Sequence, residues 1–303
     1  MSTQAWSLLF GLGMIWGGTF YFTEILLLSM TPFHIVFFRV SIAAVVMLGY
    51  IHLRGKRLPL DPRSLKQFAI MGFFNNALPF SCIVFGQQYI TAGLASILNS
   101  ATAFVTVMVA GVFMKDEPIT IPRLTGTILG VIGVAVTMGI DHLSSLSLAS
   151  IGQILVLTAT GCYAIASMYG RLRVQNHGVE VAATGMLVAA SCWMLLLSLL
   201  VEGVPVIALD PGSVLALLAF AIPCTSLAYI LYFALLKLAG AGNTMLVTII
   251  IPVFALVIDA LLLGEVISLR EMTGFLIIAF GLLILSGRLP LPRLPGKVQK
   301  KRR

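Results

Sequence analysis

The chain has 303 residues, of which 59% are hydrophobic and 10% are charged, with a formal net charge of +8. Soluble globular domains carry roughly 25% charged residues, so this composition excludes an ordinary soluble enzyme and indicates a membrane protein. The positive charge could suggest a nucleic-acid partner, but the Lys and Arg residues fall between apolar segments, where they favour membrane orientation instead.

Apolar segments long enough to cross a membrane recur along the whole chain. A hydrocarbon core about 30 Å thick takes about 20 apolar helical residues to cross. The sequence therefore predicts an all-α integral membrane protein with ten transmembrane helices, at Ala5–Leu28, Phe33–Leu53, Gln67–Gln88, Gly93–Met114, Leu124–Ile140, Ile151–Gly170, Val179–Val201, Val214–Lys237, Thr244–Leu263 and Met272–Gly287. The first lacks the basic start and the cleavage site of a signal peptide, so we expect it to be retained.

The basic residues predict an orientation for these helices. With the N-terminus in the cytoplasm, 17 of the 19 Lys and Arg residues fall on the cytoplasmic side, while Arg270 falls on the other side and Arg39 inside a helix. Cytoplasmic loops of membrane proteins carry an excess of Lys and Arg. We therefore expect both termini in the cytoplasm, with residues 289–303 forming a basic cytoplasmic tail.

Two stretches of the chain resemble each other. "KDEPITIPRLTGTILGVIGVAVTMG" (115–139) and "GEVISLREMTGFLIIAFGLLILSG" (264–287) align without gaps at a constant offset, which matches Gly126 to Gly274 and Gly133 to Gly281. They join the fourth to the fifth and the ninth to the tenth predicted helix, so the repeat unit is five helices. Because five is odd, the second copy must be inverted, which predicts repeats at 1–145 and 146–288 and a substrate site between them.

The chain resembles a known family at three places: "IWGGTF" (15–20), "PFHIVFFRV" (32–40) and "DEPITIPRLTGTILGVIGV" (116–134). These stretches are similar to the EamA-type branch of the drug/metabolite transporter superfamily. The resemblance implies ten helices in two inverted halves and export of amino acids or other small metabolites across the bacterial inner membrane, with exporters of aromatic and other neutral amino acids the most similar. Many relatives have a lysine where this chain has Glu24, and some have a tryptophan where it has Thr102. A mechanism that uses that lysine does not carry over, and strict aromatic specificity is not implied.

Three ionisable residues lie well inside predicted helices: Glu24, Arg39 and Asp259. A charge in the bilayer costs several kcal/mol, so such residues usually face the interior and pair. Glu24 and Arg39 are nearly equidistant from the first turn, which predicts an ion pair between them. Asp259 is predicted to pair with Arg270 across the turn at Gly264-Glu265, between the ninth and tenth predicted helices. Both pairs could serve structure alone, or one member could bind substrate or exchange a proton.

Prolines at corresponding places in the two halves point to the substrate site. Pro79 in "NNALPFS" (75–81) and Pro223 in "IPCTS" (222–226) each free a backbone carbonyl, and Pro252 frees that of Thr248. Amides and hydroxyls suit a zwitterion, and aromatic rings supply an apolar wall. The predicted substrate-binding residues are Trp16, Asn75, Asn76, Ser81, Asn99, Thr102, Tyr163, Tyr229 and Thr248, of which Asn99, Thr102, Tyr163 and Thr248 are expected to converge near the midplane. Each of them could instead join helices or anchor at the interface.

The sequence favours a secondary transporter that exports amino acids. A multidrug or organic-cation exporter of the same fold is an alternative, and an intramembrane enzyme or a channel is disfavoured because no catalytic set, ring of like charge or filter motif is visible. The absence of a Walker motif argues against direct use of ATP, which leaves proton antiport and facilitated diffusion open. We expect membrane lipids as surroundings, and no cofactor, metal or nucleic-acid partner.

Overall fold

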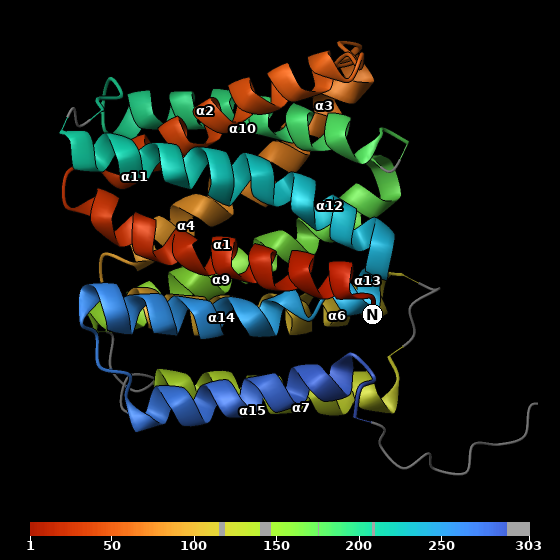
Figure 1. The fold of residues 1–303 in the computed structure, drawn as a ribbon, viewed down its shortest axis with the longest axis vertical. Coiled ribbons are helices and arrows are strands. Elements are labelled where there is room, and N and C mark those ends of the chain that lie inside the picture. Colours follow the sequence, from red (N-terminus) through yellow and green to blue (C-terminus); the bar gives the residue numbers. More distant parts are fainter. Residues whose placement is uncertain (115–118, 140–146, 175, 208–209, 290–303) are drawn as a thin grey trace, which may run out of the picture.

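The computed structural model describes residues 1–114, 119–139, 147–174, 176–207 and 210–289. The predicted repeat boundary at 145/146, Lys115 and most of the basic tail lie outside this part of the chain. The described residues form a bundle in which the long helices lie side by side and alternate in direction (Figure 1). The helices are α1 (Thr3–Leu27), α2 (Pro32–Leu53), α3 (Pro62–Gly72), α4 (Leu78–Gly86), α5 (Ala92–Asn99), α6 (Thr102–Phe113), α7 (Ile121–Met138), α9 (Leu148–Tyr169), α10 (Val179–Val201), α11 (Pro211–Ala221), α12 (Ala228–Ala239), α13 (Ala241–Thr244), α14 (Val247–Ile258) and α15 (Leu269–Leu285).

Each of the ten predicted segments overlaps helix in the described residues. Eight helical stretches are long and apolar enough to cross a membrane, and Val247–Leu263 is a shorter apolar helix. The eight stretches are Thr3–Leu27, Pro32–Leu53, Pro62–Gly86, Ala92–Phe113, Ile121–Met138, Leu148–Val174, Val179–Val201 and Pro211–Ala239. The chain is therefore a multi-pass helical membrane protein.

Two helices begin earlier than their apolar residues predict, because an Asp-Pro pair starts each of them. Asp61 caps α3 by accepting a hydrogen bond from the Ser64 backbone N–H at 3.0 Å, and Asp210 caps α11 through the Ser213 N–H at 2.8 Å. Proline follows each cap at a position where a helix needs no N–H donor. The hydrogen bonds from Ser64 and Ser213 hold the pKa of both carboxyls below its usual value.

The α-helix is interrupted near Pro79 and near Pro223, two of the prolines from which the sequence predicts the substrate site. A π-helical turn at Phe73–Ala77 (η1) separates α3 from α4, and another at Ile222–Leu227 (η3) separates α11 from α12. Such turns have a wider backbone and commonly lie at functional sites of helical proteins. At Pro252, by contrast, α14 continues without interruption.

Helices α7 and α15, which carry the repeated sequence, pack against each other through glycines. A Cβ on Gly126 would lie 2.7 Å from the carbonyl oxygen of Gly281, and a Cβ on Gly133 would lie 2.9 Å from that of Gly274. Only glycine allows the two backbones to approach this closely. Since Gly126 matches Gly274 and Gly133 matches Gly281 in the repeat, the two contacts are reciprocal.

Helices α2 and α10 are joined at both ends by glutamates of α10. At one end, the Glu202 carboxylate accepts hydrogen bonds from the Thr31 hydroxyl at 2.6 Å and from the backbone N–H groups of Phe33 and His34 at 3.2 and 3.1 Å. At the other end, Glu180 forms an ion pair with Lys56. Buried side chains of α2, α4, α10 and α11 form a core cluster between these two ends.

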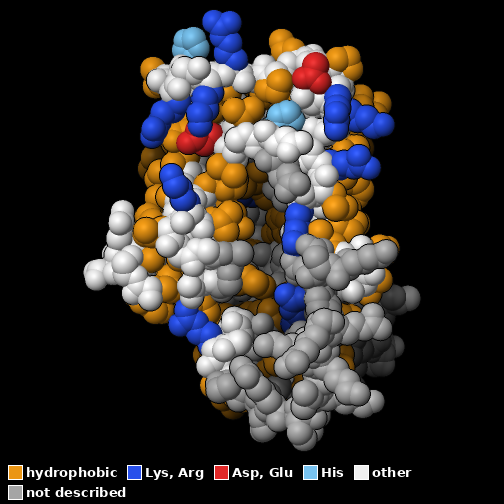
Figure 2. All heavy atoms as spheres, turned by 90° about the vertical axis from the view of Figure 1, so that its right-hand side faces the viewer, with side chains coloured by type: hydrophobic (Ala, Val, Ile, Leu, Met, Phe, Trp, Pro, Cys, Tyr) orange, Lys and Arg blue, Asp and Glu red, His pale blue; other side chains and the backbone are white. Residues whose placement is uncertain are grey.

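Lys and Arg side chains gather at one end of the bundle. The N-terminus and the loop after α2 lie at this end in Figure 1, and Figure 2 shows the basic side chains viewed from that side. The turn after α1 and the turn before α15 lie at the opposite end (Figure 1).

Candidate functional site

A buried arginine lies where α2 meets helices of both halves of the chain. Arg39 is 7% exposed, and its guanidinium carbon lies 3.8 Å from the ring centre of Phe80 and 4.0 Å from that of Phe220. Its Nε–H donates to the Thr225 hydroxyl at 2.9 Å. Among the described residues no carboxylate forms an ion pair with Arg39. The aromatic rings stabilise the cation by cation–π contact, but they leave its terminal N–H groups available to an anion.

The π-helical turn of Ile222–Leu227 holds Thr225 in place for this contact. The Thr225 hydroxyl donates to the Phe220 carbonyl oxygen at 3.0 Å, five residues back, and so accepts from Arg39 with its free lone pair. The Ser226 hydroxyl similarly reaches the carbonyl of Ala221 at 3.2 Å. These hydroxyls satisfy carbonyl groups in a stretch where the α-helical hydrogen bonds are interrupted.

Two tyrosines lie near Arg39, and two amides are hydrogen-bonded to one of them. Tyr163 of α9 and Tyr229 of α12 are close enough to interact with the guanidinium electrostatically. The Tyr229 hydroxyl accepts hydrogen bonds from the amides of Asn75 at 3.2 Å and Asn76 at 2.9 Å, both in the π-helical turn Phe73–Ala77. Four predicted site residues are therefore connected to Arg39, two of them directly and the two asparagines through Tyr229. We call these five residues the Arg39 cluster.

A run of aromatic rings extends from this cluster to Trp16. The ring centres of Tyr229 and Phe233 are 6.3 Å apart, those of Phe233 and Tyr232 are 5.5 Å apart, and those of Tyr232 and Trp16 are 5.6 Å apart. Trp16 of α1 is thus connected to Tyr229 of the Arg39 cluster by a chain of ring contacts that runs through Tyr232 and Phe233 of α12.

The other predicted site residues lie elsewhere or bond locally. The Ser81 hydroxyl donates to the Ala77 carbonyl at 2.7 Å, that of Thr102 to Asn99 at 2.7 Å, and that of Thr248 to Met245 at 2.6 Å. Asn99 ends α5, and its buried Oδ1 has no hydrogen-bond partner within the described residues. In that part of the chain, no hydrogen bond or ring contact joins Asn99, Thr102 or Thr248 to the Arg39 cluster.

Both predicted ion pairs are absent from the described residues. Glu24 lies 3.4 Å from the Gln87 amide, whereas Arg39 faces Phe80, Phe220 and Thr225. Equal distance from a turn sets the depth of two residues in the bundle, but not the side of each helix on which they lie.

The second predicted pair fails for a similar reason. Arg270 lies against Gly139 at the end of α7, and neither carboxylate oxygen of Asp259 has a hydrogen-bond partner within the described residues.

Sequence reasoning missed the two rings that enclose Arg39. Phe80 follows Pro79 and Phe220 precedes Pro223 by three residues, so their closeness to the helix breaks was a signal. It was a weak signal, because phenylalanine is common throughout this chain, which has 18 of them.

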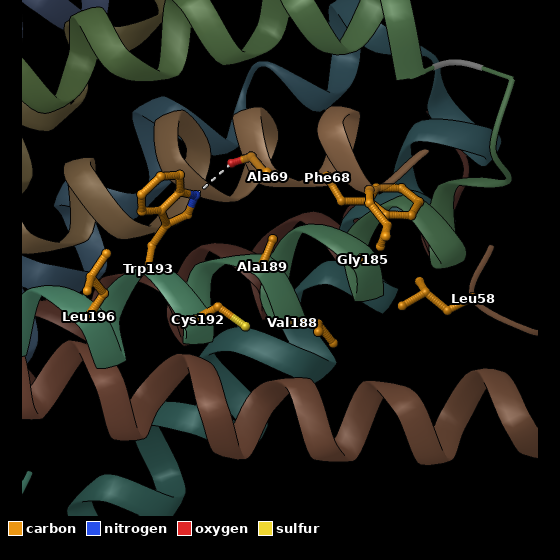
Figure 3. A pocket seen from close by; sticks show the side chains of 10 residues that line it. Leu58, Phe68, Ala69, Gly185, Val188, Ala189, Cys192, Trp193 and Leu196 are labelled. Carbon is orange, nitrogen blue, oxygen red and sulfur yellow. Dashed lines mark hydrogen bonds between the residues drawn. The ribbon is translucent and has the colours of Figure 1, made fainter. Parts of the chain in front are cut away.

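A cavity whose lining includes none of the Arg39 cluster lies between α3 and α10 (Figure 3). It measures about 390 Å³ and is lined by Leu58, Leu65, Phe68, Ala69, Gly185, Val188, Ala189, Cys192, Trp193 and Leu196. The Trp193 ring N–H is already bonded to the Ala69 carbonyl at 3.0 Å. The lining therefore offers a zwitterion no charged group, and its one free side-chain donor is the weakly donating thiol of Cys192.

A membrane-spanning helical bundle with broken helices and a polar cluster in its interior is an architecture shared by many membrane transport proteins. The sequence model of the EamA-like transporter family matches residues 4–139 and again residues 150–287. The chain therefore belongs to the EamA-like transporter family.

Several relatives and a solved structure are similar over nearly the whole chain. A protein of Salmonella typhimurium named "Probable amino-acid metabolite efflux pump" is 28% identical over 89% of this chain and 91% of its own length. The Escherichia coli protein of the same name is 25% identical over 89% and 91%, and the uncharacterized transporter YoaV of Bacillus subtilis is 24% identical over 89% and 92%. A crystal structure with 15% identity matches with a TM-score of 0.69 over 96% of this chain and all of that one, which shows the fold alone. The family and these names indicate a transporter rather than an enzyme.

Proposed function

We propose that the protein is a secondary transporter that exports aromatic and other neutral amino acids, or similar small metabolites, across the bacterial inner membrane. The observation that carries this proposal is Arg39, a buried guanidinium between two aromatic rings with no carboxylate partner among the described residues. Arginine binds carboxylates through two parallel N–H groups. The names of the relatives from Salmonella and Escherichia coli support amino-acid export.

In this proposal, Arg39 binds the carboxylate of the amino acid. Tyr163 and the amides of Asn75 and Asn76, with the hydroxyl of Tyr229, lie where they can hold the amino group and the polar end of the substrate. The rings from Tyr229 to Trp16 offer an apolar wall to the side chain. Ser81, Asn99, Thr102 and Thr248 remain proposed residues of the pathway, without a hydrogen bond or ring contact to Arg39 in the described part of the chain.

We further propose ten transmembrane helices in two inverted repeats, residues 1–145 and 146–288, which operate by alternating access. The reciprocal contacts Gly126–Gly281 and Gly133–Gly274 support this arrangement. The first glycine of each copy contacts the second glycine of the other copy. Two copies that contact each other in this reciprocal way are related by a two-fold axis. The two π-helical breaks, at Phe73–Ala77 and Ile222–Leu227, also fall at matching places in the two halves.

The basic end of the bundle is proposed to face the cytoplasm, together with both termini and the tail at residues 289–303. An excess of Lys and Arg marks the cytoplasmic side of a membrane protein, and Figure 2 shows such residues gathered there.

Transport by purified protein in liposomes tests the proposed substrate. We expect exchange of labelled phenylalanine and methionine in the wild type, and a loss of about 10- to 100-fold in Arg39→Gln, because a hydrogen bond to a charged group contributes about 1.5–3 kcal/mol. Amino-acid amides, which lack the carboxylate, should be poor competitors. Arg54→Gln, in an exposed loop, is the matched control and should transport normally.

The same experiment separates amino-acid export from organic-cation export. A cation exporter would be inhibited by hydrophobic cations, and Arg39→Gln would transport them as well as the wild type or better. That result, or wild-type amino-acid exchange in a folded Arg39→Gln protein, would contradict the proposal.

A further inference from the structure

Asp259 is a buried carboxylate at the end of the bundle opposite the basic one, and no described residue pairs with it. It begins the π-helical turn Asp259–Leu263 after α14 and is 1% exposed. Neither of its oxygens has a hydrogen-bond partner within the described residues. It lines a small cavity of about 40 Å³ together with Thr91, Gly93, Leu94, Leu256, Glu265, Val266, Ile267 and Glu271. This volume is large enough to hold a water molecule.

The titratable groups that face Asp259 are also acidic. Glu265 in the turn before α15 and Glu271 in its first helical turn line the same cavity, and Glu24 of α1 interacts with Asp259 electrostatically. Burial, and then the charge of Glu271, raises the pKa of the Glu265 carboxyl, although a hydrogen bond with Thr91 opposes this. From α5, Gly93 approaches Asp259, because a Cβ on Gly93 would lie 3.3 Å from its Oδ2.

No cation of the described residues neutralises this group of acids. Arg270 is exposed, and its guanidinium lies against Gly139 at the end of α7. An ionised carboxylate with neither a counter-ion nor a hydrogen bond is among the most costly groups to bury. Neighbouring negative charges increase that cost further. The described residues contain no group of three potential metal ligands that would relieve it.

We propose that Asp259 is a proton-binding site that couples transport to the proton gradient. The carboxylate takes up one proton to become a neutral carboxylic acid in the arrangement seen here, in which α5 and the turn before α15 enclose it. When these elements separate, water reaches the carboxyl group and the proton is released to the solvent. The coupling rests on the proposed transport function, whereas the binding of the proton does not.

Infrared spectroscopy of the purified protein tests the proton site directly. At pH 7 the wild type should show the carbonyl stretch of a protonated carboxylic acid, and Asp259→Asn should lack it. Glu24→Gln, Glu265→Gln and Glu271→Gln are matched controls that should retain it. A sodium salt in place of a potassium salt should leave the band unchanged. The proton site is overturned if the wild type and Asp259→Asn give the same spectrum in this region. It is also overturned if sodium abolishes the band.

Thermal stability gives a second readout that does not depend on transport. An aspartate in water loses its proton well below neutral pH, so a protein that keeps Asp259 protonated loses stability relative to Asp259→Asn as the pH rises. We expect the melting temperature of Asp259→Asn minus that of the wild type to increase between pH 5 and pH 9. An unchanged difference would contradict protonation in the folded state.

Transport in liposomes tests the coupling. Asp259→Asn should exchange amino acids across the membrane at the wild-type rate but should no longer accumulate them in response to a pH gradient. If the variant still accumulates substrate, the coupling is wrong. If the wild type transports no amino acid in either assay, the proposed function fails, while the infrared and melting results still decide whether Asp259 binds a proton.

Discussion

The hydroxyl of Tyr229 accepts hydrogen bonds from two amides, those of Asn75 and Asn76. Asn76 is fully buried, and its amide donates to Tyr229 at 2.9 Å. Tyr229→Phe would leave this donor without a partner, which costs about 1–3 kcal/mol. We expect Tyr229→Phe to lower the free energy of unfolding by this amount, as measured by denaturant titration in detergent.

Two further variants test this assignment. Tyr89→Phe, at a tyrosine that is 40% exposed, should be nearly neutral. Tyr229→Phe should cost less in an Asn76→Leu background, because the buried amide is then absent. Equal costs in both backgrounds would mean that the hydroxyl does not serve Asn76.

At the same scale, sequence reasoning identified the polar groups better than it identified their partners. The prolines pointed to Asn75 and Asn76, and the aromatic pattern pointed to Tyr163 and Tyr229, which the structure brings together around Arg39. The ion pair predicted for Arg39 was wrong, because the side of α2 on which it lies depends on the packing of α4 and α11. No local pattern in the sequence encodes that packing.

At the scale of a helix, α2 depends on a cap from another helix. Thr31 makes no side-chain cap to α2, and Glu202 instead accepts hydrogen bonds from the first backbone N–H groups. Losing a helix cap costs about 0.5–2 kcal/mol, so Glu202→Ala should destabilise the protein by about that amount. Chemical denaturation in detergent measures it.

The ion pair at the opposite end of α10 provides the comparison. Lys56 and Glu180 are partly exposed, and pairs of this kind contribute at most about 1 kcal/mol. Glu180→Ala should therefore cost less than Glu202→Ala. The reverse order would mean that Glu202 does not cap α2.

Helix positions were predictable because the apolar segments are long, while helix starts were not. The predicted third helix began at Gln67, but α3 begins at Pro62 because Asp61 caps it. The first turn of α3 is polar, so a hydrophobic pattern does not indicate it. Only the Asp-Pro-x-Ser spacing at Asp61–Ser64 predicts where the helix begins. The breaks at Phe73–Ala77 and Ile222–Leu227 could be anticipated from prolines, but their π-helical form could not.

At the scale of the whole molecule, the proposed orientation can be tested by cysteine labelling in a Cys192→Ser background. Arg57→Cys lies at the basic end and Val266→Cys, at a residue 93% exposed, lies at the opposite end. In intact cells, a membrane-impermeant maleimide should label only Val266→Cys. Labelling of Arg57→Cys from outside would contradict a cytoplasmic basic end.

The pocket between α3 and α10 provides a ready-made position for a spectroscopic reporter. Of the four cysteines, Cys82, Cys162 and Cys224 are buried, and Cys192 alone is exposed. Cys192 lies beside Trp193 in the lining of the pocket (Figure 3). A thiol-reactive fluorophore added to the unaltered protein would therefore attach at one place, next to a natural energy donor. Cys192 and Trp193 lie on the same helix, so a movement of α3 against α10 would be followed through the change in the fluorophore's surroundings inside the pocket, without introducing any residue.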